Sequence, residues 1–156
     1  MVDEDRVVNL KVDESFIEQY VQLRNRYCDL LVTNPINAVE TREWLKREDI
    51  EIRGIVRADV LLGVVILFLN RKGEIAFFSS IDRRGFGSKL LSIIEIAAKE
   101  RGLWDVWAWV LCDNVIAQRA FLKNGYQKAE NSTKTYQGRI LQGFVFRKAL
   151  CKDIDR

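Results

Sequence analysis

The sequence predicts an α/β (α+β) domain in which a mixed central sheet of about seven strands is flanked by about four helices. Short apolar or alternating segments take turns with segments whose apolar residues recur at helical spacing. Residues 104–112 are apolar on both faces, as expected for a strand covered by helices on two sides. The predicted element order is β-α-α-β-β-β-α-β-α-β-β, which favours a sheet with both parallel and antiparallel neighbours.

The N-terminal part begins with one strand and two helices. Residues 6–12 alternate between polar and apolar and form the first strand. Asp13 offers an N-cap for a helix whose apolar residues recur at helical spacing over 16–31. Residues 33–37 form a loop that contains the single proline, and a short helix over 38–47 carries an apolar face.

The remaining elements are predicted from the same patterns. Three strands at 51–57, 60–70 and 74–81 are joined by tight turns, and a long central helix ends at Gly102. After it come a strand, a short helix and a terminal pair of strands, at 104–112, 115–123, 126–136 and 140–150. We expect one domain over 1–156, with a frayed tail at 152–156.

The chain passes from the strand before Ser79 into the central helix through two arginines and two glycines. A helix N-terminus carries unpaired N–H groups and the positive end of the helix dipole, so it attracts anions. Gly85 and Gly87 allow a ligand to approach the backbone, while Arg83 and Arg84 add charge suited to phosphate. The loop lacks the P-loop and dinucleotide-binding patterns. It predicts a diphosphate cradle, unless it is an ordinary strand-to-helix turn with solvated arginines.

Composition restricts the chemistry. The net charge of +3 is spread along the chain, which argues against a nucleic-acid surface. No histidine is present, so a Ser-His-Asp triad and a His-ligated metal are excluded. Cys28, Cys112 and Cys151 are widely spaced, which favours a reducing cytoplasm and no zinc site. The N-terminus has no signal-peptide core, and the longest apolar run, 60–69, is too short to span a membrane.

Two stretches resemble motifs of one family. Residues Asp82-Arg83-Arg84-Gly85-Phe86-Gly87-Ser88 resemble the acetyl-CoA motif of the GNAT superfamily of N-acetyltransferases, Gln/Arg-x-x-Gly-x-Gly/Ala, with Asp82 departing at the first position. The stretch from Asn114 to Tyr126 resembles the family's Asn-x-x-Ala-x-x-x-Tyr-x-x-x-Gly-Phe segment. The predicted element order matches the GNAT fold from end to end.

The resemblance implies acetyl-CoA as co-substrate, no metal, and direct attack of an amine on the thioester. It assigns cofactor binding to residues of both motifs and of the preceding strand, whose backbone receives the pantetheine: Phe77, Phe78, Ser79, Arg83, Arg84, Gly85, Phe86, Gly87, Ser88, Asn114 and Phe121. Asn114 is also suited to cap the helix that follows it.

Catalytic roles are less fully specified. Phe121 stands where the family usually has the tyrosine that protonates departing CoA, and phenylalanine has no proton to donate. Tyr126, Tyr136 and Cys112 are substitute donors that the sequence does not rank. Glu74 aligns with a position where many GNAT enzymes place a glutamate base, often acting through water. The alternative for Glu74 is a solvated turn carboxylate beside Lys72.

Three functions are compatible with these residues. The first is an N-acetyltransferase acting on a small amine such as an amino sugar, with Arg24 as a candidate for binding an anionic acceptor. The second is a protein or peptide N-acetyltransferase. The third is a CoA-binding GNAT module without turnover, because Phe121 and Asp82 depart from the family pattern. Under each, we expect a monomer or homodimer that binds neither nucleic acid nor membrane.

Overall fold

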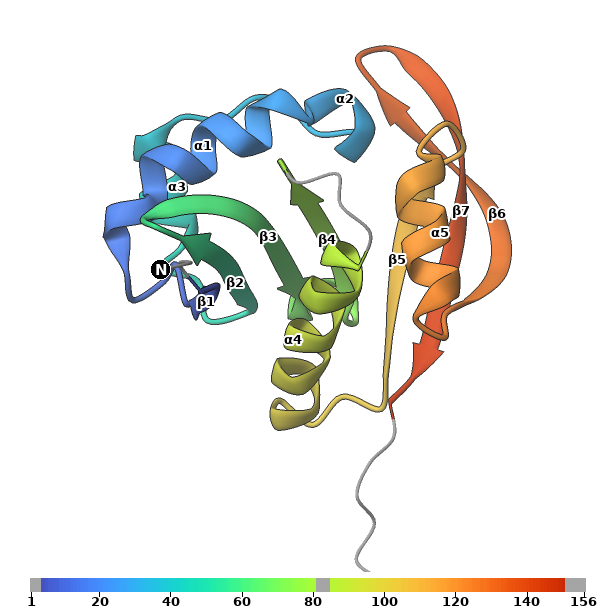
Figure 1. The fold of residues 1–156 in the computed structure, drawn as a ribbon. Helices are drawn as coiled ribbons and strands as arrows, with labels where there is room; N and C mark the ends of the chain where they lie inside the picture. Colours follow the sequence, from blue (N-terminus) through green and yellow to red (C-terminus); the bar gives the residue numbers. More distant parts are fainter. Residues whose placement is uncertain (1–3, 81–84, 151–156) are drawn as a thin grey trace, which may run out of the picture.

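The computed structural model of the chain describes residues 4–80 and 85–150, and these form a seven-stranded sheet with helices on both faces (Figure 1). The strands are β1 (Arg6–Val8), β2 (Ile50–Arg57), β3 (Val60–Phe68), β4 (Glu74–Ser79), β5 (Asp105–Leu111), β6 (Gln127–Tyr136) and β7 (Arg139–Ala149). The helices are α1 (Ile17–Arg26), α2 (Cys28–Leu31), α3 (Ala38–Trp44), α4 (Phe86–Glu100) and α5 (Val115–Lys123). The mixed sheet is as predicted, and so is the order of elements apart from one additional helix between β1 and β2.

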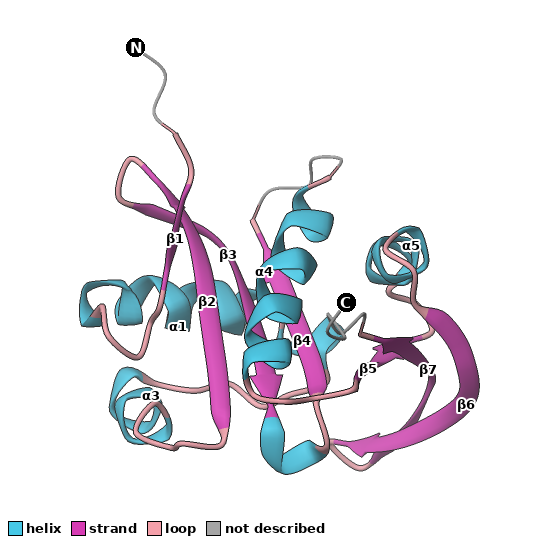
Figure 2. Cartoon of the chain, turned by 90° about the horizontal axis from the view of Figure 1, so that it is seen from below, coloured by secondary structure: helices cyan, strands magenta, loops and turns pink. Residues whose placement is uncertain are grey.

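Two hydrophobic cores lie on opposite faces of the sheet, and β3 contributes to both. Val64 and Ile66 pack on the face covered by α1 and α3, whereas Val65 and Leu67 pack on the face covered by α4 and α5 (Figure 2). Successive side chains of a strand point to opposite faces, so a strand buried on both sides needs apolar residues throughout. This explains the nearly continuous apolar run of β3.

The sheet divides between β4 and β5. The strands run in the order β1-β2-β3-β4-β5-β7-β6, and all neighbours are antiparallel except β4 and β5. That parallel pair is joined at one register position, Glu74 opposite Trp107, and the strands then diverge (Figures 1 and 2). The sheet is therefore continuous at the start of β4 and open toward its end.

The end of β4 directs alternate backbone groups to its two sides. The Ser80 N–H donates to the Leu62 carbonyl at 2.8 Å, so the even-numbered residues here face β3. In an antiparallel ladder the intervening residues face the other way. The backbone of Phe77 therefore faces the opening toward β5.

Two predicted elements differ from the structure. The predicted helix over 16–31 is divided at Tyr27 into α1 and α2, so the structure has five α-helices where about four were expected. The helical path ends at Val32, whose φ of 56° is left-handed. The first strand is shorter than 6–12, because the Asn9 carbonyl accepts the amides of Val12 and Asp13 and turns the chain.

The start of α4 is tied to the N-terminal segment by a carboxylate. Asp5 accepts from Arg57 Nε at 2.6 Å and from Lys89 Nζ at 2.9 Å, and its side chain is only 12% exposed. The hydrogen bonds from Arg57 and Lys89 lower the Asp5 pKa from 3.8 to about 2. The folded state thus favours the ionised carboxylate, so this contribution to stability is present above about pH 4 and is lost as the pH falls toward 2.

We predict that Asp5→Asn weakens the acid sensitivity of folding. The melting temperature of the wild type should fall more steeply between about pH 4 and pH 2 than that of the variant, because only the wild type loses this ionised carboxylate. Thermal melts across that range test this. Asp105→Asn, at an exposed position, is the control and should follow the wild type. If the melting temperatures of Asp5→Asn and the wild type fall equally steeply between about pH 4 and pH 2, the prediction is contradicted.

Candidate functional site

The N-terminus of α4 begins at Gly85 without a side-chain cap. Gly85 has a φ of +91°, which residues with a Cβ disfavour, and a Cβ there would meet no atom of the described residues within 4 Å. The glycine is therefore required by backbone conformation, and space is left beside it. The first-turn amides and the helix dipole make this end of α4 suited to an anion.

Gly87 lies where three elements converge. A Cβ at this position would be 3.2 Å from the Ala120 Cβ of α5 and 3.4 Å from Phe77 Cε2 of β4. Both approaches are close, so a larger side chain would displace one neighbour or fill the space between them. The two glycines of the loop thus have different roles, one conformational and one steric.

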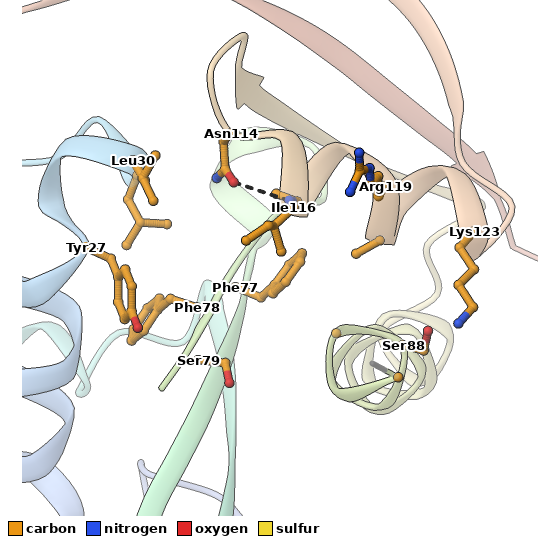
Figure 3. Close-up of a pocket in the computed structure, with 15 residues that line it drawn as sticks. Tyr27, Leu30, Phe77, Phe78, Ser79, Ser88, Asn114, Ile116, Arg119 and Lys123 are labelled. Carbon is orange, nitrogen blue, oxygen red and sulfur yellow. Dashed lines mark hydrogen bonds between the residues drawn. The ribbon is translucent and has the colours of Figure 1, made fainter. Parts of the chain in front are cut away.

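A cavity of about 690 Å³, here called the first cavity, extends from this helix end along the opening between β4 and α5 (Figure 3). Its volume lies within the range of about 300–1,000 Å³ typical of ligand pockets. Seven of the predicted cofactor-binding residues line it: Phe77, Phe78, Ser79, Gly85, Gly87, Ser88 and Asn114. The structure therefore brings the strand, the glycine loop and the second motif to one site.

Of the other four predicted cofactor residues, two do not line the first cavity and two lie outside the described residues. Phe86 is buried in the core beside Gly63, so its side chain is directed away from the cavity. Phe121 is 2% exposed, stacks on Phe146 with ring centroids 5.8 Å apart, and contacts a different cavity. Arg83 and Arg84, like Asp82, lie outside the described residues.

Asn114 connects the first cavity to α5. Its Oδ1 accepts the Ala117 N–H at 3.2 Å and so caps the helix, as the sequence predicted. The side chain also lines the first cavity, and Figure 3 shows its nitrogen directed away from the helix. The cap fixes the side chain with its donor group available to a ligand.

None of the three substitute proton donors lines either cavity described here. Tyr126 is buried and donates to Glu95 at 2.7 Å, and burial raises its pKa further from neutrality. Tyr136 donates to the Thr33 carbonyl at 2.9 Å, and its pKa is raised by desolvation and then by Asp29. The Cys112 sulfur lies 3.7 Å from an oxygen of Asp113. Their contacts indicate structural roles.

Tyr27 is a site residue that sequence reasoning missed. It lies at the break between α1 and α2, and it is the one tyrosine among the described residues that line the first cavity. Figure 3 shows its ring beside Phe78. The helical periodicity of 16–31 placed Tyr27 within a continuous helix, so nothing in the pattern indicated its exposure to the site.

A second cavity, of about 200 Å³, adjoins the first and shares Phe77, Phe78 and Asn114 with it. Glu74 lines the second cavity and is 6% exposed. One oxygen lies 3.2 Å from Arg71 Nη1 and the other 3.6 Å from Lys134 Nζ. The alternative interpretation of Glu74 as a solvated carboxylate beside Lys72 is therefore wrong.

Comparison with known proteins identifies the family. A model of the acetyltransferase (GNAT) family matches residues 12–126, which is well over half of the chain. The fold and the site thus define an acetyltransferase with acetyl-CoA as its acyl donor. The chain belongs to the GNAT family, and the resemblance of its two motifs is confirmed.

Solved structures support the fold. yncA of Salmonella typhimurium, solved with its cofactor acetyl-CoA, has a TM-score of 0.81 at 14% identity, covering 97% of this chain and 96% of that one. The ribosomal-protein-alanine N-acetyltransferase of Brucella melitensis has a TM-score of 0.79 at 16% identity, with 93% and 99% covered. The spermidine N-acetyltransferase of Vibrio cholerae, solved with CoA and spermine, has a TM-score of 0.79 at 13% identity, with 94% and 95% covered.

Three further features of known proteins are not found for this chain: a curated relative and, among the described residues, a membrane-spanning helix and a metal-binding cluster. Comparison with curated proteins returned no significant match. Within residues 4–80 and 85–150, no helix combines the length and apolar character needed to cross a membrane. The same residues contain no group of three or more His, Cys, Asp or Glu side chains arranged to hold a metal ion.

We predict that Gly87→Val prevents acetyl-CoA binding while the chain still folds. The added side chain would enter the space between Ala120 and Phe77, and we expect affinity to fall by about a hundredfold, or about 2.8 kcal/mol. Calorimetric titration with acetyl-CoA measures the loss, and a melt without ligand checks folding. Ser92→Val adds the same side chain at an exposed position of α4 and should bind normally. If Gly87→Val binds acetyl-CoA as tightly as the wild type, the glycine loop is not part of the acetyl-CoA site.

Proposed function

We propose that this acetyltransferase transfers the acetyl group of acetyl-CoA to a primary amine of a small molecule such as an amino sugar, with both substrates bound together. One observation carries the proposal: the two cavities meet at the wall formed by Phe77 and Phe78, where β4 separates from β5. The first cavity suits the coenzyme, and the second, with its buried carboxylate, suits a small acceptor.

The residues of the first cavity are suited to bind acetyl-CoA. The first-turn amides after Gly85 face the diphosphate in this proposal, and Arg83 and Arg84 add positive charge. The backbone of Phe77, which faces the opening, offers groups that can pair with the pantetheine in place of β5. Asn114 supplies a further side-chain donor.

The acceptor ammonium must lose two protons, one before it attacks and one from the tetrahedral intermediate, and CoA must depart. The second proton passes to the departing thiolate or to solvent. The amine nitrogen bonds to the thioester carbonyl carbon, the carbon–sulfur bond breaks, and CoA leaves as the thiolate. We assign Glu74 as the base that takes the ammonium proton, directly or through water, because it is the one carboxylate among the described lining residues of the second cavity. A thiol with a pKa of about 8.5 leaves readily near neutrality, so Phe121 does not prevent turnover.

Tyr27 is our candidate for protonating the thiolate. It lines the first cavity, whereas Tyr126 and Tyr136 do not. General acid catalysis contributes about 10²–10⁴-fold, so its loss would slow the reaction without abolishing it. In this proposal, Tyr27 takes the place of the tyrosine that the family pattern usually has at Phe121.

The size of the second cavity favours a small acceptor over a protein. Its volume of about 200 Å³ is below the range of about 300–1,000 Å³ for drug-sized ligands. Structural neighbours include enzymes named for a polyamine and for a ribosomal protein, so the fold does not decide between the two. Free Cys28 and Cys112 support action in a reducing compartment such as the cytoplasm.

The proposal is tested by CoA release with a panel of acceptors. Small amines, amino sugars and peptides with free N-termini are compared, and acetyl-CoA binding is measured separately by thermal shift. We expect release with small amines and little with peptides. Preferential use of peptides would favour a protein acetyltransferase, and stabilisation by acetyl-CoA without release for any acceptor would indicate a module that binds CoA without turnover.

We predict that Glu74→Gln lowers the rate by about 10²–10⁴-fold near neutral pH and by less at higher pH. At higher pH more of the acceptor arrives as the free amine, which needs no base. The pH dependence of kcat tests this, and acetyl-CoA affinity should stay unchanged because Glu74 lies outside the first cavity. Glu130→Gln, at an exposed position of β6, is the control. A wild-type pH profile in Glu74→Gln would eliminate Glu74 as the base.

A further inference from the structure

The second cavity carries an excess of positive charge. Among its described lining residues, three are cations and one is a carboxylate: Arg24, Arg71, Lys134 and Glu74. Charges facing a partly enclosed space interact more strongly than charges in bulk water. The excess repels an acceptor with several ammonium groups and attracts one that carries an anionic group.

Glu74 is already shared between two of these cations. Each of its oxygens faces one of them, Arg71 at 3.2 Å and Lys134 at 3.6 Å. Lys134 is 36% exposed and has three N–H donors, so its contact with Glu74 leaves donors that a ligand can reach. Arg24 approaches from α1 on another wall, where Nη1 donates to the Asn34 carbonyl at 3.0 Å and the other guanidinium donors remain for a ligand.

Two buried polar atoms of the same cavity wall have no hydrogen-bond partner within the described part of the chain: Thr33 Oγ1 and Trp109 Nε1. Buried donors and acceptors are nearly always paired, so unpaired ones point to a missing partner. The indole N–H can only donate, and it therefore requires an acceptor atom such as a carboxylate or phosphate oxygen.

The Trp109 ring is held in this position by its neighbours. A Cβ at Gly143 would lie 2.3 Å from two indole ring atoms, so the absence of a side chain on β7 makes room for the ring. Lys134 Nζ lies 4.7 Å from the ring centroid. The N–H donor and the cation are thus placed together by β5, β6 and β7.

We infer that the acceptor is a small primary amine that also carries an anionic group, a carboxylate or a phosphate. Lys134 and Arg24 bind this group, and Trp109 donates to one of its oxygens. The inference rests on the proposed function and narrows its substrate class. It assigns the second cavity to recognition of negative charge, with Glu74 left to receive the ammonium proton.

Matched acceptor pairs test this inference. We compare β-alanine with β-alaninamide, and phosphoethanolamine with ethanolamine, and we include spermidine as a cationic acceptor. We expect kcat/KM to be about tenfold higher for the anionic member of at least one pair, with the difference shrinking as salt is added. The pair that responds identifies the anionic group as carboxylate or phosphate.

The members of a pair differ in amine basicity. The decisive quantity is therefore how much a variant changes the ratio of kcat/KM for the anionic member to kcat/KM for the neutral member. Lys134→Gln should lower the ratio of kcat/KM for the anionic member to kcat/KM for the neutral member about three- to tenfold. Lys134 also contacts Glu74, and any change in the base affects both members and cancels in this ratio. Lys134→Arg should restore the ratio. Lys128→Gln lies on the same strand and outside the cavity lining, beside the Phe144 ring, and should behave as wild type.

The outcomes separate the inference from the proposed function. The inference is overturned if the ratio of kcat/KM between the anionic and neutral members is unchanged in Lys134→Gln, or if the enzyme prefers spermidine or neutral amines. CoA release with any of these acceptors still supports the proposed function. Absence of CoA release with every amine rejects the proposed function, and the inference with it. Melting temperatures check folding, and Arg24→Gln repeats the comparison from α1 if Lys134→Gln is unstable.

Discussion

The structure depends on one break in its hydrogen-bond ladder. β4 and β5 are parallel neighbours, yet they are joined only at Glu74 and Trp107. Buried backbone groups need partners, so the side of β4 turned toward the opening, at Phe77, is a place where a ligand can replace a strand. Both cavities lie beside this divergence: β4 lines each of them, and Trp109 and Val110 of β5 line the second.

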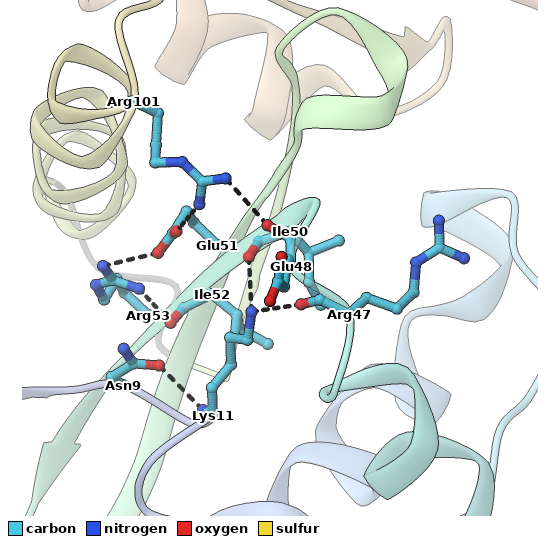
Figure 4. Close-up of polar contacts among 9 residues, drawn as sticks. All are labelled: Asn9, Lys11, Arg47, Glu48, Ile50, Glu51, Ile52, Arg53 and Arg101. Carbon is cyan, nitrogen blue, oxygen red and sulfur yellow. Dashed lines mark hydrogen bonds and ion pairs between the residues drawn. The ribbon is translucent and has the colours of Figure 1, made fainter.

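The long helix α4 presents its N-terminus at this opening, and β2 fixes both of its ends. Near the start, Asp5 links Lys89 to Arg57 at the end of β2, and beyond the last turn Arg101 donates to Glu51 near the beginning of β2 (Figure 4). These ion pairs join nearly buried carboxylates to partly exposed cations, and each adds little beside the burial of the apolar face of α4, which provides most of its stability. The charged contacts set the position of the helix along the sheet, and therefore where its amides point.

Sequence patterns predicted the elements and named seven of the residues that line the first cavity, because those features are local. Gly85 and Gly87 lie in one loop, and a helix cap such as Asn114 is recognised from a few neighbouring residues. In the second cavity, Glu74 and Arg24 were named from the sequence, but the pairing of Trp109 with Lys134 was not, because these two residues lie on strands that are brought together only in the folded sheet. Trp109 lies in an apolar strand, where periodicity indicates core and gives no sign of an unpaired N–H.

The short helix α2 lies where the two cavities adjoin, and the turn that ends it has a strained backbone conformation. Val32, which ends it, is β-branched and has a φ of 56°, a conformation that costs about 1–3 kcal/mol. The Cys28 carbonyl accepts the amides of both Val32 and Thr33, and Tyr136 of β6 donates to the Thr33 carbonyl, so the turn is held from two directions. The strain therefore persists beside the second cavity, where it ends α2 and directs the following loop toward β6. The left-handed turn at Val32 therefore places Thr33 in the wall of the second cavity at a cost in local stability.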